Sequence, residues 1–293
     1  ACLSRRRSPV RARSLPPQCI MKSLFFKKKP LGPLVSKFFS SLRNFIRKIK
    51  IFVRGNYFII NKNSYVGDGL ASNHVVDFLK EEKFINSYNE GEKTGALNNH
   101  PTGIHYRAYI ACYFAKHALN LEGDFVECGV GKGLLAKTIS VYLNFEKLNK
   151  KFYLFDTYQG IPVTQAQTEK EKELMKWLND TIYTSKDYFN EVSNTFSNYK
   201  NIKLIKGLIP NCLNDVQIEK VSFISIDLNN AFAEIKAIEF FWNKLVSYGV
   251  VLLDDYAYSE SYRLQKSSWD KFAKSKNLEI LTLPTGQGLL IKN

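Results

Sequence analysis

An acidic residue followed by three alternating glycines is the first feature of the sequence that could bind a cofactor. Glu127 lies in an apolar run, Gly129, Gly131 and Gly133 follow, and a helical pattern begins at Leu134. Glycines let the backbone turn sharply close to a ligand, and the start of a helix offers free N–H groups. A dinucleotide fingerprint needs its third glycine one position later, where Leu134 stands. The spacing therefore favours S-adenosylmethionine, whose ammonium group Glu127 can receive directly or through water.

A second acidic residue follows the next apolar run. Asp156 comes 23 residues after Gly133, and Thr157 follows it. This distance fits one helix and one strand. An acid at the end of a second strand can accept hydrogen bonds from both ribose hydroxyls of a nucleoside. We therefore expect Asp156 and Thr157 to contact the cofactor.

Three further carboxylates end later apolar runs: Asp227 ends one, and Asp254 and Asp255 end the next. The carboxyl ends of parallel strands lie on one edge of an open sheet, where ligands bind, so the three side chains should converge. Converging carboxylates repel unless a cation neutralises them, and their oxygen atoms suit Mg²⁺ or another divalent cation. We predict all three as metal ligands, with Asp227 and Asp254 acting in metal-assisted catalysis.

Alternating strands and helices must position these residues. Apolar runs predict strands over residues 124–128, 152–156, 202–206, 221–227, 250–254, 279–283 and 288–292. Helical patterns over 134–143, 169–196 and 233–245, and a short turn near 210–216, separate the first five, and another helix over 104–120 precedes them. The alternation predicts a parallel sheet with helices on both faces. The short connection 284–287 predicts a closing antiparallel hairpin. The expected fold is α/β, a Rossmann-like class I methyltransferase with a seven-stranded, mostly parallel sheet.

The chain resembles the macrocin O-methyltransferase family, a metal-dependent group that methylates sugar hydroxyls on macrolides and related natural products. The resemblance covers about residues 100–293 and rests on the blocks GDFVECGVGKG, FYLFDTYQGIP, NIKLIKG, SFISIDLNNA, GVVLLDDYAY and LPTGQGLLIKN. It implies S-adenosylmethionine as methyl donor and a divalent cation held by the three aspartates. The residues that we assign to the cofactor are Glu127, Gly129, Gly131, Gly133, Asp156, Thr157, Gly207 and Asp227.

Two features depart from the family's pattern. Members that act on macrolide sugars tend to show Asp-x-Asp after the fourth strand, and this chain has Asp227-Leu228-Asn229. Members proposed to use a histidine base carry it after the second strand, but residues 157–200 contain no histidine. The general base therefore stays open. The candidates that remain are His100, His105 and Tyr183.

The net charge of +15 comes from one end of the chain. The first 60 residues hold 15 Lys or Arg and no acid, whereas the rest holds 27 basic and 27 acidic residues. This balance of charges argues against a basic nucleic-acid-binding groove in the main domain. Composition suggests three parts: residues 1–20, disordered and upstream of a natural start at Met21; a basic helical extension, 21–95; and the methyltransferase domain, 96–293.

Apolar residues recur every three or four positions between residues 34 and 53, and Lys and Arg fill the rest. Such a basic amphipathic helix can lie in an anionic membrane interface, or it can dock on the protein's own core or on a second subunit. No apolar stretch approaches the roughly 20 residues that span a bilayer. The five cysteines form no C-x-x-C pair, which favours a reducing compartment. We expect a cytoplasmic protein, attached to the inner membrane face if the helix binds lipid and a homo-oligomer if it binds a subunit.

These patterns together predict an S-adenosylmethionine-dependent O-methyltransferase. Its acceptor would be a hydroxyl of a sugar, glycan or natural product, and its reaction would need a divalent metal. Two other classes stay open: an NAD(P)-dependent Rossmann oxidoreductase or epimerase, and a non-catalytic, membrane-associated binding module that keeps the fold. Leu134 and the Asp254-Asp255 pair argue against the oxidoreductase. Titration with S-adenosylhomocysteine, NAD and NADP separates these classes.

Overall fold

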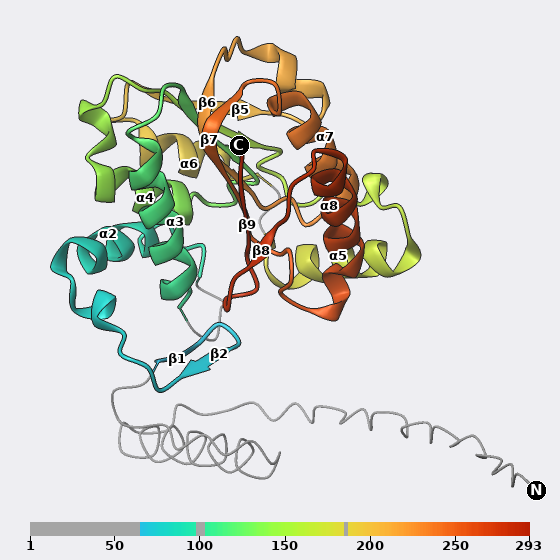
Figure 1. Cartoon of the computed structure of the whole chain (residues 1–293), viewed down its shortest axis with the longest axis horizontal. Helices are drawn as coiled ribbons and strands as arrows, with labels where there is room; N and C mark the ends of the chain where they lie inside the picture. The colour runs from blue at the N-terminus through green and yellow to red at the C-terminus, as the bar shows by residue number, and fades with distance from the viewer. Residues whose placement is uncertain (1–64, 98–102, 185–186) are drawn as a thin grey trace, which may run out of the picture. The chain divides into compact units, whose positions relative to one another are not determined.

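The computed structural model describes residues 65–97, 103–184 and 187–293 (Figure 1). By its packing the chain divides into two units, Ala1–Phe58 and Ile59–Asn293. The first unit lies outside the described residues, as do the helix predicted over residues 34–53 and His100. The membrane attachment and the assembly expected of that helix stay predictions. Within the described part, no helix is long and apolar enough to cross a membrane.

A seven-stranded sheet forms the centre of the second unit, with the strand order β5-β4-β3-β6-β7-β9-β8. Neighbours from β5 to β7 pair in parallel, whereas β9 pairs antiparallel with both β7 and β8. The predicted fold class is thereby confirmed. The strands are β3 (Asp124–Cys128), β4 (Phe152–Asp156), β5 (Ile202–Lys206), β6 (Val221–Ile226), β7 (Leu245–Leu253), β8 (Leu281–Thr282) and β9 (Gly288–Ile291).

Helices cover both faces of the sheet (Figure 1). On one side lie α2, α3, α4 and α6, and on the other lie α7 and α8. Because successive strand residues point to opposite faces, Phe125 and Phe223 pack with the first layer, and Val126 and Ile224 pack with the second. The helices are α2 (Glu82–Glu92), α3 (His105–Ala118), α4 (Leu134–Leu143), α5 (Glu169–Thr181), α6 (Phe189–Phe196), α7 (Ala231–Phe241) and α8 (Arg263–Ser275).

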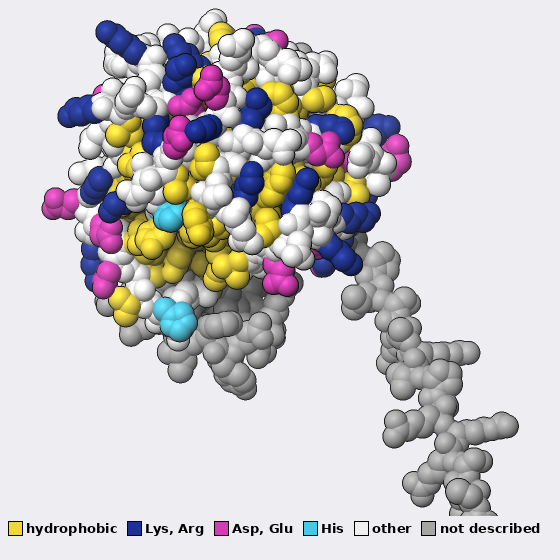
Figure 2. All heavy atoms as spheres, turned by 45° about the horizontal axis from the view of Figure 1, so that its top comes forward, with side chains coloured by type: hydrophobic (Ala, Val, Ile, Leu, Met, Phe, Trp, Pro, Cys, Tyr) yellow, Lys and Arg dark blue, Asp and Glu magenta, His cyan; other side chains and the backbone are white. Residues whose placement is uncertain are grey.

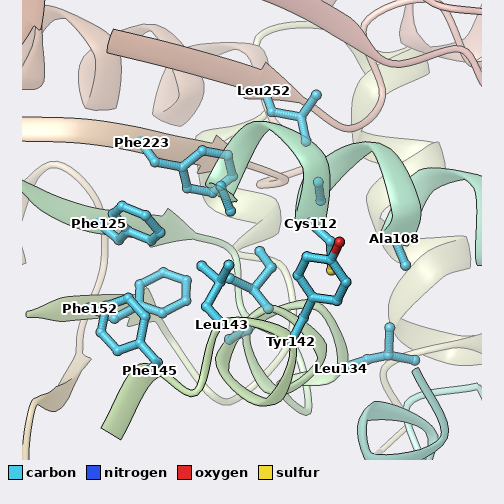
Figure 3. Close-up of a cluster of buried hydrophobic side chains, with 14 of the residues drawn as sticks. Ala108, Cys112, Phe125, Leu134, Tyr142, Leu143, Phe145, Phe152, Phe223 and Leu252 are labelled. Atoms are coloured by element: carbon cyan, nitrogen blue, oxygen red, sulfur yellow. The ribbon is translucent and has the colours of Figure 1, made fainter. Parts of the chain in front are cut away.

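Aromatic side chains fill the first layer, as Figure 3 shows around Leu143 of α4. The ring of Phe125 lies 5.3 Å from those of Phe145 and Phe223, centroid to centroid. Aromatic pairs at this separation stabilise a core beyond the area that they bury. The centre of the sheet is therefore a rigid support for the loops at its edge.

Residues 65–95, which composition suggested were an extension, pack against the rest of the second unit. They form a hairpin, β1 (Tyr65–Gly67) and β2 (Leu70–Ser72), a 3₁₀ turn and α2. Gly91 of α2 lies so close to α4 that a Cβ there would overlap the Thr138 side chain and come within 2.8 Å of the Leu134 carbonyl oxygen. The compact unit accordingly begins at Ile59.

The single helix expected over residues 169–196 is two helices, and that expectation was wrong. Helix α5 ends at Thr181 and α6 begins at Phe189. Tyr188 explains the break, because its backbone N–H donates to the Tyr158 carbonyl oxygen at 3.1 Å and its hydroxyl donates to Asp156 at 3.3 Å. These bonds hold Tyr188 beside the end of β4, so α5 does not continue into α6.

Two other local expectations differ from the structure. The helix expected over residues 233–245 ends at Phe241, because Leu245 already pairs with Val221 of β6. Helix α8 was not predicted; its charged residues obscured a buried stripe that includes Trp269 and Phe272. Both differences arise because packing against the sheet, rather than local pattern, decides where a short helix ends or forms.

Charges of both signs share the surface. On the face shown in Figure 2, Lys and Arg side chains lie among acidic and hydrophobic ones. Among the described residues, exposed ion pairs join Lys220 to Glu122 and Arg263 to Glu260. A nucleic-acid groove needs a continuous basic stripe, and the described residues of this face do not form one.

A buried carboxyl group joins the two helices of the second layer and predicts a pH effect on stability. The Glu234 carboxylate of α7 accepts a hydrogen bond from the Trp269 indole N–H of α8 at 2.7 Å. Burial raises the pKa of Glu234 to about 8. A carboxyl whose pKa is raised on folding binds more protons in the folded state, so its contribution to stability falls as the pH rises from about 4.5 to about 8.

We expect Glu234→Gln to remove this contribution, because glutamine keeps a hydrogen-bond acceptor without the charge. Between pH 5 and 8 the free energy of unfolding of the wild type should fall more steeply than that of the variant, by up to about 1.4 kcal/mol per pH unit. Urea unfolding at several pH values measures both slopes. Parallel curves would show that Glu234 does not gain a proton on folding.

Candidate functional site

A cavity of about 490 Å³ opens at the carboxyl ends of β3, β4, β6 and β7. This is the edge where open parallel sheets bind ligands, and the volume suits a small molecule. Most of the residues predicted from sequence line it. They are Glu127, Gly129, Gly131, Asp156, Thr157, Tyr183, Asp227 and Asp254.

Glu127 supplies a buried carboxyl group to one part of the cavity. Its side chain is buried, and its Oε2 atom has no hydrogen-bond partner within the part of the chain that the structure describes. Burial, followed by the negative charge of Asp227, raises the pKa of Glu127 well above its ordinary value. A buried carboxyl without a partner is costly, so this atom fits a cationic ligand group in the cavity.

Gly129 allows the loop after β3 to lie against the end of β6. Its φ angle is +89°, and a Cβ there would overlap the Asp227 carbonyl oxygen. Backbone hydrogen bonds hold the approach on both sides, from Gly129 N–H to the Phe155 carbonyl oxygen and from Asp227 N–H to the Cys128 carbonyl oxygen, each at 2.8 Å. The loop is thereby fixed to both neighbouring strands.

Asp156 binds the glycine loop itself. Its Oδ2 accepts hydrogen bonds from the backbone N–H groups of Val130 at 2.7 Å and Gly131 at 2.9 Å, and its Oδ1 accepts from that of Tyr158 at 2.6 Å. Burial raises the pKa of Asp156, and these three N–H groups oppose the rise. Asp156 therefore organises the loop in addition to lining the cavity, a role that the sequence did not indicate.

Asp227 lies in the cavity at the end of a chain of hydrogen bonds. The Asn229 amide N–H donates to Asp227 Oδ1 at 2.9 Å, and the Tyr262 hydroxyl donates to Asn229 Oδ1 at 3.0 Å. Burial, together with the neighbouring carboxylates Asp254 and Asp255, raises the pKa of Asp227 well above its ordinary value. Asn229 and Tyr262 thus fix one oxygen of this carboxylate.

Arg107 of α3 lies beside the carboxylate of Asp254. Its Nη1 donates to Asp254 Oδ2, while Nε and Nη2 together bind the carboxylate of Asp68, the latter at 2.7 Å. Gln287 Nε2 donates to the other oxygen, Asp254 Oδ1, at 3.1 Å. Both oxygens of Asp254 are therefore engaged by side chains of the protein.

The donor set does not fit the predicted metal site. Both Asp254 oxygens have N–H partners, Asn229 binds one oxygen of Asp227, and Asp255 is buried away from the cavity lining. No group of three His, Cys, Asp or Glu side chains within residues 65–97, 103–184 and 187–293 is arranged to hold a metal ion. A metal ion is not needed to neutralise Asp254, because Arg107 of α3 already places a positive charge beside it.

Three other predicted residues lie outside the cavity lining. Gly133 begins α4 beside the Phe196 ring, and Gly207 lies against Cys212. The His105 ring packs against the Tyr88 ring, with centroids 4.0 Å apart and planes tilted by 30°, and burial lowers the pKa of His105. These positions give the two glycines packing roles and leave the His105 side chain outside the cavity lining.

Arg107 is the residue that sequence reasoning missed. Its position was visible as a charge on a buried helix face, because Arg107 lies one helical turn before the buried Ala111. Arginine is almost never fully buried without a partner. A lone arginine on a buried helix face therefore signals an acidic partner elsewhere in the fold.

Comparison with known proteins agrees with this architecture. Residues 111–281 match the family model of the macrocin O-methyltransferases (TylF). Among solved structures, the O-methyltransferase NovP is 16% identical, with a TM-score of 0.59 over 72% of this chain and 100% of that one. CalS11, a calicheamicin methyltransferase, is 12% identical, with a TM-score of 0.49 over 74% of this chain and 94% of that one.

A comparison with curated proteins finds no match. The likeness to NovP shows the fold, while the family model covers more than half of the 293 residues, including the glycine loop and all the strand ends that line the cavity. The chain therefore belongs to the macrocin O-methyltransferase family.

Proposed function

We propose that this chain transfers the methyl group of S-adenosylmethionine to a hydroxyl of a sugar or a sugar-bearing natural product. One observation carries the proposal: Glu127, whose Oε2 has no hydrogen-bond partner among the described residues, and Asp227 line the same cavity. Such a cavity has a carboxyl for the donor's ammonium group and a second carboxyl for the acceptor. Family membership supports the hydroxyl acceptor.

The chain's own residues account for binding and proton removal. When bound, S-adenosylmethionine would supply a methyl carbon for attack by the acceptor oxygen, and the bond from that carbon to sulfur would break to leave S-adenosylhomocysteine. The protein must hold the acceptor oxygen about 3 Å from that carbon, and a base must take the hydroxyl proton. Glu127 holds the amino end of the donor, and Asp227, with its Oδ1 fixed by Asn229, takes the proton.

A divalent cation has no step in this proposal, because Arg107 and Gln287 engage both oxygens of Asp254. Tyr183 lines the same cavity, and burial raises the pKa of its hydroxyl well above the ordinary value. A phenol with a raised pKa stays protonated and donates a hydrogen bond. We therefore propose Tyr183 as a hydrogen-bond donor and not as the base.

We expect Glu127→Gln to weaken the binding of S-adenosylhomocysteine by roughly ten- to a hundred-fold, because a hydrogen bond to a charged group contributes about 1.5–3 kcal/mol. Isothermal titration of the full chain measures the affinity. Glu122→Gln is the matched control, since Glu122 is exposed and paired with Lys220 on the surface. Tight binding of NAD instead of S-adenosylhomocysteine would favour the oxidoreductase class.

A further inference from the structure

We propose that the cation at the acceptor end of the cavity is the guanidinium group of Arg107, so that this enzyme works without a divalent metal ion. The inference rests on the proposed function, because it concerns the acceptor end of the same cavity. It departs from the metal site that the three aspartates suggested.

The first support is the geometry of Arg107. Three of its five N–H donors bind carboxylates, two on Asp68 and one on Asp254. A planar guanidinium that meets a carboxylate through two parallel bonds is held in orientation as well as in place. The Arg107 side chain is only 9% exposed, yet it lines the cavity.

Four separate segments contribute to the hydrogen-bond network around Arg107. Asp68 lies at the turn of the β1–β2 hairpin, Arg107 on α3, Asp254 at the end of β7, and Gln287 just before β9. Tyr258 closes the arrangement, because its ring lies 4.7 Å from the Arg107 guanidinium and its hydroxyl donates to Asp68 Oδ1 at 3.3 Å. Several independent contacts therefore oppose displacement of the guanidinium.

Charge balance is the second support. A divalent cation at Asp254 would have to displace the Arg107 Nη1 and Gln287 Nε2 atoms from its two oxygens, next to a buried positive charge that repels it. At Asp227, the Asn229 amide already donates to Oδ1 at 2.9 Å. Asp227 and Asp254 thus already accept hydrogen bonds from the protein, and Arg107 adds a fixed positive charge where a divalent metal ion would have to bind.

This substitution has a chemical consequence. Within the described residues, three of the five N–H groups of Arg107 bind Asp68 and Asp254, which leaves two without a partner there. They can donate to the acceptor's oxygens while Asp227 takes the proton. Because a guanidinium stays protonated throughout the physiological range, the charge at this end of the cavity is constant and does not depend on the supply of metal. Arg107 is therefore a positioning residue for the acceptor.

Manganese binding to the full chain, followed by electron paramagnetic resonance, tests the proposal without an acceptor. We expect no wild-type site with a Kd tighter than on the order of 1 mM. The melting temperature should be the same in EDTA and in Mg²⁺. Removing one partner of a buried ion pair is strongly destabilising, so Arg107→Ala should lower the melting temperature by about 10 °C. Mn²⁺ should restore part of that loss, and Asp254→Asn in the same chain should abolish the restoration.

Arg263→Ala is the matched control, because Arg263 forms an exposed pair with Glu260. Its melting temperature should change by less than about 2 °C. If Arg107→Ala does not fold, Arg107→Lys tests the same point, since it keeps one positive charge and should fold without binding Mn²⁺. A single wild-type Mn²⁺ site that Asp254→Asn removes would overturn the proposal.

Binding of S-adenosylhomocysteine in EDTA keeps the two proposals distinguishable. If it binds wild type and Arg107→Lys with affinities within about three-fold, the donor half of the cavity is intact and the manganese result concerns the acceptor end alone. If it fails to bind wild type, the proposed function fails, whereas the manganese result still decides which cation neutralises Asp254.

Discussion

Asp156→Ala is expected to reduce S-adenosylhomocysteine binding at least about 100-fold and to destabilise the protein by about 3 kcal/mol or more. The Asp156 carboxylate accepts hydrogen bonds from three backbone N–H groups, two of them in the glycine loop. Each buried donor that loses its partner costs about 1–3 kcal/mol. The loop would then no longer be held in its shape before the ligand arrives.

Two measurements separate the roles of Asp156. Urea unfolding without ligand reports its bonds to the loop, and isothermal titration reports the predicted contact with the ribose. Asp124→Ala is the control, because Asp124 also lies at a strand end and accepts one backbone N–H, from Lys151 at 2.8 Å, but is more exposed and lies at the other end of β3. If stability is unchanged but binding is lost, Asp156 contacts the ribose and does not support the loop. If binding is unchanged, Asp156 does not contact the ribose.

Gly129→Ala is expected to be more damaging still and to leave little folded protein. Its Cβ would overlap the Asp227 carbonyl oxygen, which belongs to the end of the neighbouring strand β6, and its φ angle of +89° disfavours any side chain. Forcing an extra carbon into a packed contact costs about 1–3 kcal/mol, and the left-handed conformation adds roughly 1–2 kcal/mol. Soluble yield, circular dichroism and S-adenosylhomocysteine titration measure the loss.

Gly131→Ala is the matched control for Gly129. Gly131 lies in the same loop with a positive φ of +51°, but the nearest atom to its Cβ, Cε1 of Tyr183, would be 3.9 Å away. In this variant the added Cβ has no close contact and only the positive φ angle is unfavourable, so the protein should stay folded. Equal destabilisation of the two variants would contradict the close approach of Gly129 to the end of β6.

Local pattern alone determined most of the fold. Strand β3 and helix α4 begin and end where alternation, glycines and helical spacing predicted. Strands β4 and β5 do so as well, because short apolar runs bounded by polar residues depend little on distant parts of the chain. The placement of Glu127, Asp156, Asp227 and Asp254 at one edge follows from the strand ends in a parallel sheet. Their common cavity was therefore predictable from sequence.

Only the tertiary structure decided which partners these carboxylates take. Arg107 meets Asp68 across 39 positions of sequence and Asp254 across 147, and Asp156 turns to the glycine loop 25 and 26 positions before it. Asp255, adjacent to Asp254, is excluded from the cavity lining. Sequence spacing sets the face and the strand end on which a residue lies. The partner of a buried charge depends on which charged groups lie near it and how far they are removed from water in the folded chain. Distant segments bring those groups together, and local sequence patterns do not show which segments meet.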